Sequence, residues 1–299
     1  MSQGAALPAE LMSDDELREI AALPTVRRVR YGRYLAVAAI LVILGFIAKA
    51  FAEGQIEWSV VARFFTAPAI IYGFLNTIWM TACAMALGLV LGVTFAVMYM
   101  SPNKVISRCA VGYIWFFRGT PLLLQLLLWF NLALVFPIIG IPGLWEARTV
   151  DVMTPFVATL LGLGMNQGAY TAEVVRGGIL SVDQGQVEAS KSIGMTPLAT
   201  LFHIVLPQAM RVIVPPVGNE VISMVKLTSI ASVIGYSEIL RNAQNVYYAN
   251  GRVIELLIVT AAWYLAVVTV LQIVQYFIER HFSKGYGRRK GVPAVPAAA

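Results

Sequence analysis

Charged residues are scarce in this sequence: they make up 13% of its 299 residues, whereas hydrophobic residues make up 59%. Soluble domains usually carry about 25% charged residues. The scarcity of charge therefore excludes an ordinary soluble domain. A mean hydropathy of +0.74 indicates instead that the solvent of much of this chain is lipid.

The residues that usually carry enzyme chemistry are also few. Cys83 and Cys109 form no CxxC pair and no disulfide framework, so both are expected to be packing residues. His203 and His281 stand alone, there is no HExxH, and no metal site is expected. The sequence also lacks GxxxxGK[ST], the loop that cradles ATP phosphates. We predict neither a catalytic residue nor a bound cofactor in this chain.

Long apolar runs are what the sequence does have, and about 20 residues suffice to span a bilayer as a helix. The pattern predicts an all-α integral membrane protein with about six transmembrane helices. They are expected at Tyr34–Phe51, Ile70–Met100, Val105–Ile139, Pro155–Val174, Val212–Tyr236 and Val253–Ile278. In the second run, Gly88 and Gly92 form a GxxxG pattern, which allows two helices to approach closely in lipid.

The net charge of +6 follows from topology and does not indicate nucleic-acid binding. With a cytoplasmic N-terminus and six spans, fifteen Lys and Arg residues fall inside and five outside, as the positive-inside rule requires. We expect a cytoplasmic tail at 1–33, a first span with its outer loop at 34–69 and a core at 70–282. Residues 283–299 are basic and then rich in Pro and Ala, which predicts a disordered cytoplasmic tail.

A break is predicted within the third span, because Pro121 cannot donate to the carbonyl of Phe117. Thr120 as N-cap and Pro121 as first residue would restart the helix there. The N-terminus of such a half-helix carries partial positive charge, which suits a substrate carboxylate. Arg118 would add a full charge; it either reaches the cytoplasmic interface or contacts the pore or a ligand.

Polar residues in the fourth and fifth spans are further candidates. Glu173 and Arg176 are three apart on a helix and are expected to form a structural pair. Asn166, with Gln167 beside it, lies deeper and is a candidate for lining a polar pathway.

Pro215-Pro216 predicts a bend or a helix start. Beyond it, Glu220 and Lys226 are six apart and do not share a helix face. Each therefore needs partners from elsewhere, either along a substrate path or in pairs between spans.

The most informative stretch is the polar loop between the fourth and fifth spans, about residues 183–207. Gly194 can adopt the left-handed conformation that joins two short helices. Glu188, Ala189 and the short side chains of Ser190 and Ser192 would present a shallow surface. We expect this elbow to dock into a groove on another protein.

The same loop resembles the EAA loop of permease subunits of type I ATP-binding-cassette importers, written as EAA, three residues, Gly, nine residues and I-x-L-P. Glu188-Ala189-Ser190, Gly194 and Ile204-Val205-Leu206-Pro207 match its spacing, with Ser190 in place of the third Ala. The resemblance makes this elbow the site of coupling to an ATPase.

Flanking signatures are similar to those of the polar amino-acid branch of that family. They are Phe117-Arg118-Gly119-Thr120-Pro121 continuing to Leu126, Ala169-Tyr170-Thr171-Ala172-Glu173, Arg176-Gly177-Gly178-Ile179 and Leu206-Pro207-Gln208-Ala209. The resemblance covers roughly residues 73–278. Leu227 departs from it, because the branch often has Asp after the Lys at this place.

The resemblance implies a permease fold and a complex in the bacterial cytoplasmic (inner) membrane. Its partners would be a second permease subunit, identical or related, cytoplasmic ATPase subunits that bind ATP and Mg, and an extracytoplasmic solute-binding protein. The cargo would be a polar amino acid or a close derivative, for which Arg118, Thr120, Gln125, Asn166 and Glu220 are the candidate pathway residues. An ion-coupled secondary transporter or channel is the alternative, since charged residues and broken helices also suit that class.

Overall fold

The structure, a computed structural model, describes Asp15 and residues 31–54, 56–141 and 143–282. The chain divides into two compact units, Met1–Ile56 and Glu57–Ala299. Most of both predicted tails, 1–33 and 283–299, lies outside the described residues. In the first unit, the predicted first span is a single helix, α2 (Tyr31–Glu53), whose side chains are exposed all round. Such a helix suits a lipid environment.

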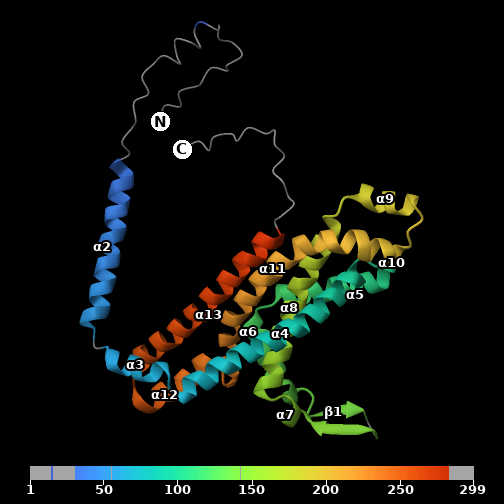
Figure 1. The fold of residues 1–299 in the computed structure, drawn as a ribbon. Coiled ribbons are helices and arrows are strands. Elements are labelled where there is room, and N and C mark those ends of the chain that lie inside the picture. Colours follow the sequence, from blue (N-terminus) through green and yellow to red (C-terminus); the bar gives the residue numbers. More distant parts are fainter. Residues whose placement is uncertain (1–14, 16–30, 55, 142, 283–299) are drawn as a thin grey trace, which may run out of the picture. The chain divides into compact units, whose positions relative to one another are not determined.

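The second unit is mostly helical and carries one small antiparallel hairpin (Figure 1). Its long helices are α4 (Pro68–Tyr99), α8 (Pro155–Leu180), α11 (Leu206–Leu227) and α13 (Val253–Phe282). The shorter elements are α3 (Trp58–Phe65), α5 (Lys104–Gly119), α6 (Leu122–Phe130), η2 (Leu132–Leu134), β1 (Ile138–Ile141), β2 (Trp145–Arg148), α7 (Thr149–Val152), α9 (Gln184–Ser192), α10 (Pro197–Thr200), η3 (Leu201–Val205), η4 (Thr228–Ile234) and α12 (Ile239–Asn250).

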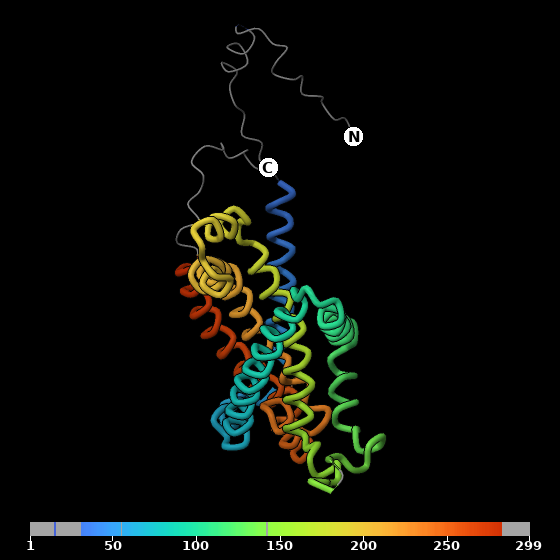
Figure 2. The backbone as a smooth tube through the Cα atoms, turned by 90° about the vertical axis from the view of Figure 1, so that its right-hand side faces the viewer, coloured from blue at the N-terminus to red at the C-terminus, as the bar shows by residue number. Residues whose placement is uncertain are grey.

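The centre of this unit is the packing of α4 against α8, which lie side by side in both ribbon views (Figures 1 and 2). The predicted GxxxG pair makes this contact. A Cβ on Gly88 would lie 2.5 Å from Cγ of Gln167, and a Cβ on Gly92 would lie 2.6 Å from Cβ of Thr171. Only glycine allows the two backbones to approach this closely.

The third predicted span is broken where the sequence indicated, between α5 and α6, which bend by 102°. The capping prediction was wrong. The N-cap of α6 is Pro121, whereas Thr120 ends α5 and donates its hydroxyl to the carbonyl of Phe116 at 2.8 Å. The helix also stops at Phe130 instead of Ile139, because the chain then forms the hairpin of β1 and β2. The described part of the chain is mostly helical, as predicted, with this two-stranded hairpin added.

The paired prolines do not start a helix, which was one of the two predicted alternatives: Pro215 and Pro216 lie inside α11, and the other alternative, a bend, stays a prediction. Membrane helices tolerate proline where side chains or neighbouring helices supply hydrogen bonds. Proline at these positions deprives the carbonyls of Arg211 and Val212 of their usual helical donors. The carbonyl of Pro215 itself accepts from the amide of Gln275 on α13 at 2.9 Å and from that of Asn219 at 3.3 Å, and the first of these bonds joins α11 to α13.

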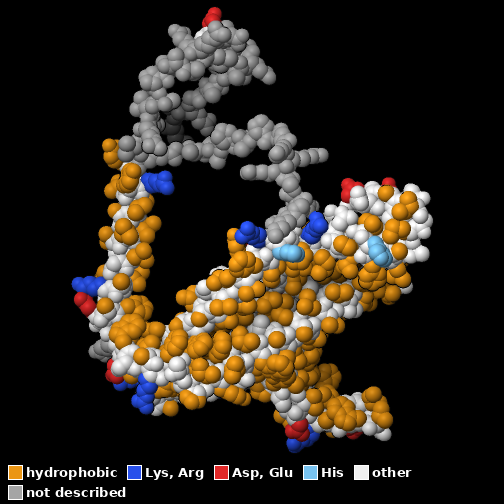
Figure 3. All heavy atoms as spheres, in the orientation of Figure 1, with side chains coloured by type: hydrophobic (Ala, Val, Ile, Leu, Met, Phe, Trp, Pro, Cys, Tyr) orange, Lys and Arg blue, Asp and Glu red, His pale blue; other side chains and the backbone are white. Residues whose placement is uncertain are grey.

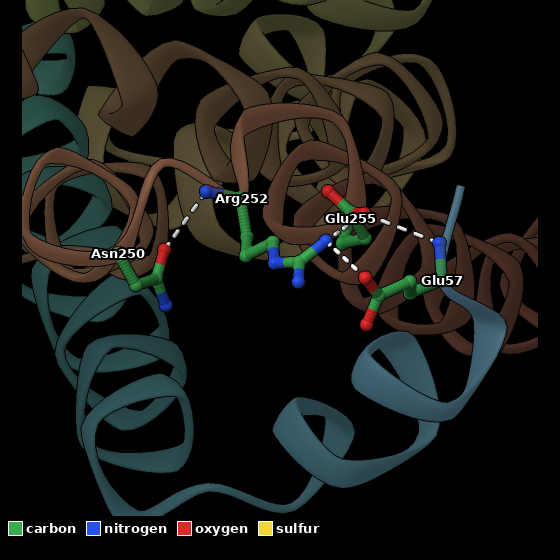
Figure 4. A network of polar contacts seen from close by, with 4 residues as sticks. All are labelled: Glu57, Asn250, Arg252 and Glu255. Atoms are coloured by element: carbon green, nitrogen blue, oxygen red, sulfur yellow. Dashed lines mark hydrogen bonds and ion pairs between the residues drawn. The ribbon is translucent and has the colours of Figure 1, made fainter. Parts of the chain in front are cut away.

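The short helix α3 is tied to the start of α13 by a charged network (Figure 4). The Arg252 guanidinium lies 2.6 Å from the Glu57 carboxylate and 3.8 Å from that of Glu255. The backbone amide of Glu57 also donates to Glu255 at 3.2 Å. Trp263 of α13 stacks on Phe65 at the other end of α3, so both ends of this helix are fixed.

Four helical stretches in the described part of the chain are long and apolar enough to cross a membrane, or five if α5 and α6 form one bent span. Although α8 is 26 residues long, polar residues and glycines lower its hydropathy. The count of six spans stays a prediction. Figure 3 shows apolar side chains over much of the visible surface of the helices, as expected of a chain that lies in lipid.

Candidate functional site

The predicted elbow follows α8 and consists of α9, a turn at Gly194 and α10. The side chain of Asp183 caps α9 by accepting from the amide of Gly185 at 2.7 Å, and the hydroxyl of Thr196 caps α10. Gly194 has φ +79°, the left-handed conformation that the sequence analysis required of it. Figures 1 and 2 place α9 at one end of the second unit, opposite the hairpin.

The second helix of the elbow is not a separate short helix, contrary to the sequence prediction. α10 continues through the π-helical turn η3 directly into α11. Leu206 and Pro207, the end of the motif, form the first turn of α11 and lie half-buried and exposed, respectively. A force applied to α10 therefore acts on a continuous stretch of helix that reaches the middle of the bundle.

The outer surface of the elbow differs from the predicted one. Glu188 and Ala189 are exposed, as expected, but Ser190 is only 3% exposed. Its hydroxyl donates to the carbonyl of Val187 at 2.7 Å and lies 3.0 Å from the hydroxyl of Thr200. Ser190 thus joins α9 to α10 from within and is not part of a docking surface.

Exposed apolar side chains add to that surface, and the sequence analysis missed them. Ile193 is 78% exposed, Leu198 is 68% exposed and Phe202 is 59% exposed. Large apolar side chains exposed at a helical elbow, beside the carboxylate of Glu188, suit a protein partner. Ile193 directly precedes Gly194, and this position beside a predicted turn was the signal that could have found it.

A second site is an open cavity of about 430 Å³ in the second unit, and Pro121, Tyr170 and Ser223 in its lining are exposed. It lies where the break between α5 and α6 faces α8 and α11. Its lining residues are Thr120, Pro121, Leu122, Asn166, Gln167, Tyr170, Glu220, Ser223 and Leu227. Three of the five predicted pathway residues, Thr120, Asn166 and Glu220, therefore meet in one cavity although they come from distant parts of the sequence.

The other two predicted pathway residues contact this lining, Gln125 from behind it and Arg118 from its edge. Gln125 is buried, and its amide donates to the carbonyl of Phe117 and to the hydroxyl of Thr120, at 3.0 and 2.8 Å. Asn166 donates to the same Phe117 carbonyl at 2.8 Å. Arg118 is exposed, and its guanidinium carbon lies 5.1 Å from the ring centroid of Tyr170, a cation–π contact at the edge of the cavity.

Glu220 is held by α8. Gln167 donates its amide to the Glu220 carboxylate at 2.6 Å, and Thr171 donates its hydroxyl to the same oxygen at 3.0 Å. The sequence analysis required partners from another span, and these are the partners. Thr171 and Ser223 were not predicted. Each lies one helical turn from a predicted polar residue, which was the signal that could have found them.

A polar crevice of about 400 Å³ lies on the other side of α11, against α13. Lys226 lies exposed at its margin, and Ser223 borders both hollows. Its remaining lining residues are Asn219, Ile222, Gln272, Gln275, Tyr276 and Glu279. Lys226 and Glu220 thus face different hollows and do not pair.

The remaining signature residues Glu173, Arg176, Gly119 and Gly177 do not line the cavity. Glu173 and Arg176 form the predicted ion pair at 2.8 Å, and Arg176 also lies over the ring of Tyr99. Gly119 and Gly177 have open space around them, whereas Gly178 packs closely against Ile213 of α11. Among the described residues, no group of three or more His, Cys, Asp or Glu could hold a metal ion.

Known proteins resemble this chain over most of its length. Residues 88–284 match the family described as binding-protein-dependent transport system inner membrane component. The arginine transport system permease protein ArgU of Corynebacterium glutamicum is 40% identical over 260 residues, which cover 86% of this chain and 82% of ArgU. The nopaline transport system permease protein NocM of Agrobacterium fabrum is 33% identical, over 77% of this chain and 95% of NocM.

Among solved structures, an amino acid ABC transporter crystallised with histidines matches with a TM-score of 0.67 and 34% identity, over 76% of this chain and 99% of that one. The chain belongs to the family of binding-protein-dependent inner membrane transport components. It has the permease fold of type I ABC importers and is a permease subunit of such an importer. This finding favours the importer over the secondary transporter or channel.

Proposed function

We propose that this chain forms part of the translocation pathway of an ATP-driven importer and is moved by separate ATPase subunits at the α9–α10 elbow. The observation that carries this proposal is the elbow itself. It exposes Glu188, Ile193 and Phe202 at one end of the bundle, and it is continuous with α11, which carries Glu220 into the central cavity. Movement at the elbow would thus reach the cavity through one helix.

The partners follow from this arrangement. ATP and Mg would be bound by the cytoplasmic ATPase subunits and not by this chain. The elbow and both termini would face the cytoplasm of a bacterial cell, with the chain in its cytoplasmic membrane. A second permease subunit, identical or related, would complete the pathway, and a solute-binding protein would deliver cargo from outside. The transporter would alternate between an inward-open and an outward-open state. Binding of ATP and of the loaded binding protein would need only to change the populations of these two states.

We further propose a polar amino acid or a close derivative as the cargo. Relatives named for arginine, nopaline and L-cystine transport support this class. The cavity supplies complementary groups: the carboxylate of Glu220 for an ammonium group, and the N-terminus of α6 for a carboxylate. No side chain caps the first turn of α6, so its amides are available to an anion.

A reconstituted complex tests the coupling. We expect the chain to co-purify with an ATPase encoded beside it, and ATP hydrolysis to rise several-fold when a loaded binding protein is added. Glu188→Lys and Gly194→Val should abolish uptake while the protein still reaches the membrane, because the first reverses a surface charge and the second cannot adopt φ +79° without strain. Normal uptake by both variants would contradict the role of the elbow.

The cavity has a separate test. Alanine at each of the candidate residues Arg118, Thr120, Gln125, Asn166 and Glu220 should change either the apparent affinity or the maximal rate of uptake. The matched control is Asn131→Ala, whose exposed side chain donates only to the carbonyl of Leu127. Unchanged uptake in all five variants would remove the cavity from the pathway and leave the coupling proposal intact.

A further inference from the structure

The connection between α6 and α8 contains the hairpin of β1 and β2, which plays no part in the elbow or the cavity. Figures 1 and 2 show it at the end of the second unit opposite α9. Ile139 pairs with Ala147 and Ile141 with Trp145, while Ile138 pairs with Arg148 and Gly140 with Glu146. Because side chains alternate between the two faces of a strand, these pairs fall on opposite faces.

The two faces have opposite chemistry. One carries Ile139, Ile141, Trp145 and Ala147, all apolar, and the other carries both charged side chains of the hairpin together with Ile138, which is 60% exposed at its base. Ile141 is 62% exposed, Trp145 is 56% exposed, and Leu144 in the turn is 79% exposed. A soluble protein rarely exposes such a patch unless it contacts a partner or a membrane.

The apolar surface continues toward the membrane-embedded part of the chain. Between α6 and the hairpin lie Leu134, Val135 and Phe136, all largely exposed. α6 ends at Phe130, and α8 begins at Pro155. The hairpin therefore connects the end of α6 with the start of α8. If both helices span the bilayer, as the sequence predicts, it lies next to the bilayer surface.

The base of the hairpin is fixed. The buried Thr149 donates its amide to the carbonyl of Pro137 at 3.0 Å and its hydroxyl to the carbonyl of Phe136. Arg148 and Asp151 form two hydrogen bonds, at 2.8 and 3.0 Å. These contacts tie the base of the hairpin to the residues on either side of it.

We propose that this hairpin is an interfacial anchor. It inserts Ile141, Leu144 and Trp145 into the lipid headgroup layer on the side of the membrane opposite the elbow. A two-stranded hairpin has unpaired backbone groups along both edges, which cannot lie in the hydrocarbon core but are satisfied in the hydrated headgroup layer. Trp is enriched at that depth. The face with Glu146 and Arg148 then remains in water.

Lipid explains the patch better than a protein partner does. Apart from Ile138 at the base, the exposed apolar side chains of the hairpin lie on one face and in the turn, and Leu134 and Val135 are exposed in the segment that leads into it. Non-obligate protein partners cover a mixture of polar and apolar surface. The segregation of Glu146 and Arg148 to the other face matches an amphipathic element lying in the plane of a bilayer.

Site-directed spin labelling of the full-length chain tests this proposal. In a background with Cys83→Ala and Cys109→Ser, a nitroxide is placed by Leu144→Cys on the apolar side, or by Glu146→Cys on the charged face as the matched control. The protein is reconstituted into phosphatidylcholine–phosphatidylglycerol vesicles. Collisions with apolar oxygen and with a water-soluble nickel chelate are then compared.

We expect the label at 144 to collide at least several-fold more with oxygen than with the chelate, and the label at 146 to show the reverse preference. Equal access of the chelate to both labels would overturn the proposal, because the hairpin would then stand in water. Shielding of the label at 144 from both reagents would also overturn it and would indicate a protein partner or a second copy.

Quenching of tryptophan fluorescence by bromine-labelled lipids gives an independent measure. Trp145→Phe should remove part of the lipid-quenchable fluorescence of the chain, and an unchanged quenchable fraction would contradict the anchor. Neither experiment depends on the transport function proposed above.

Discussion

The amide of Gln167 on α8 donates to the carboxylate of Glu220 on α11 at 2.6 Å, directly beside the central cavity. The close approach of α4 sets this geometry, because Gly88 leaves room for the side chain of Gln167 and no more. The glycine that lets α4 pack against α8 therefore also fixes the position of Gln167, the residue that holds Glu220.

The first prediction concerns this hydrogen bond. Gln167→Met keeps the length of the side chain but removes the donor, leaving Glu220 with Thr171 as its only partner on α8. A hydrogen bond to a charged group contributes about 1.5–3 kcal/mol. We expect a loss of stability of that order in the purified protein, measured by thermal unfolding in detergent.

The matched control is Gln208→Met. The amide of Gln208 donates at the surface to the carbonyl of Ile204, and its loss should leave the unfolding temperature nearly unchanged. Equal effects of the two substitutions would show that Gln167 does not support Glu220.

The second prediction concerns the contact of α4 with α8. Gly88→Ala adds a methyl group 2.5 Å from Cγ of Gln167. Overpacking of this kind costs about 1–3 kcal/mol. Gly112→Ala on α5 meets nothing within 4 Å and should be neutral or stabilising by up to about 1 kcal/mol, because alanine favours a helix more than glycine does. We expect Gly88→Ala to lower the unfolding temperature and Gly112→Ala to leave it unchanged or raise it. Equal destabilisation by the two substitutions would argue against close packing at Gly88.

The sequence predicted the features that depend on neighbouring residues. The break near Pro121, the turn at Gly194 and the pair of Glu173 with Arg176 all follow from local chemistry. It left open whether Pro215 starts or bends a helix, and only the structure shows that Pro215 lies inside α11, where Gln275, sixty residues away, donates to its carbonyl.

The hairpin was missed for a related reason. Its short strands are as apolar as the end of a span, so hydropathy alone continues the third helix to Ile139. The cavity could be predicted only as a set of candidate residues, since the packing of α6, α8 and α11 decides which of them meet.

The third prediction tests the link within the elbow. Ser190→Ala leaves the buried hydroxyl of Thr200 without its partner, and the added Thr200→Val removes that cost. We expect the first change to destabilise by about 1–3 kcal/mol, and the double variant to lose less than the sum of the single variants. Ser192→Ala, whose exposed hydroxyl donates to the carbonyl of Glu188, is the control. Additive losses in the double-mutant cycle would mean that the two hydroxyls do not interact.

The fourth prediction is a pH dependence that arises at Glu238, which caps α12 outside the long apolar helices. Its carboxylate accepts from the amides of Leu240 and Arg241, at 2.8 and 2.6 Å, and from the hydroxyl of Tyr264 at 2.9 Å. Burial disfavours the charged form more than these bonds favour it, and it raises the pKa of Glu238 from 4.5 to about 7.

The sign of the effect follows from this pKa. Below pH 4.5 the group is protonated in both the folded and the unfolded chain, and nothing is lost. Between pH 4.5 and 7 the unfolded chain releases a proton that the folded chain keeps, so stability falls as pH rises, and above about pH 7 the loss is complete. Glu238→Gln mimics the protonated acid. We expect its unfolding temperature to exceed that of the unmodified protein by a margin that grows from pH 5 to pH 8, corresponding to about 3 kcal/mol at most. The exposed Glu146→Gln should show no such trend, and a constant margin for Glu238→Gln across this range would mean that Glu238 is already ionised at pH 5.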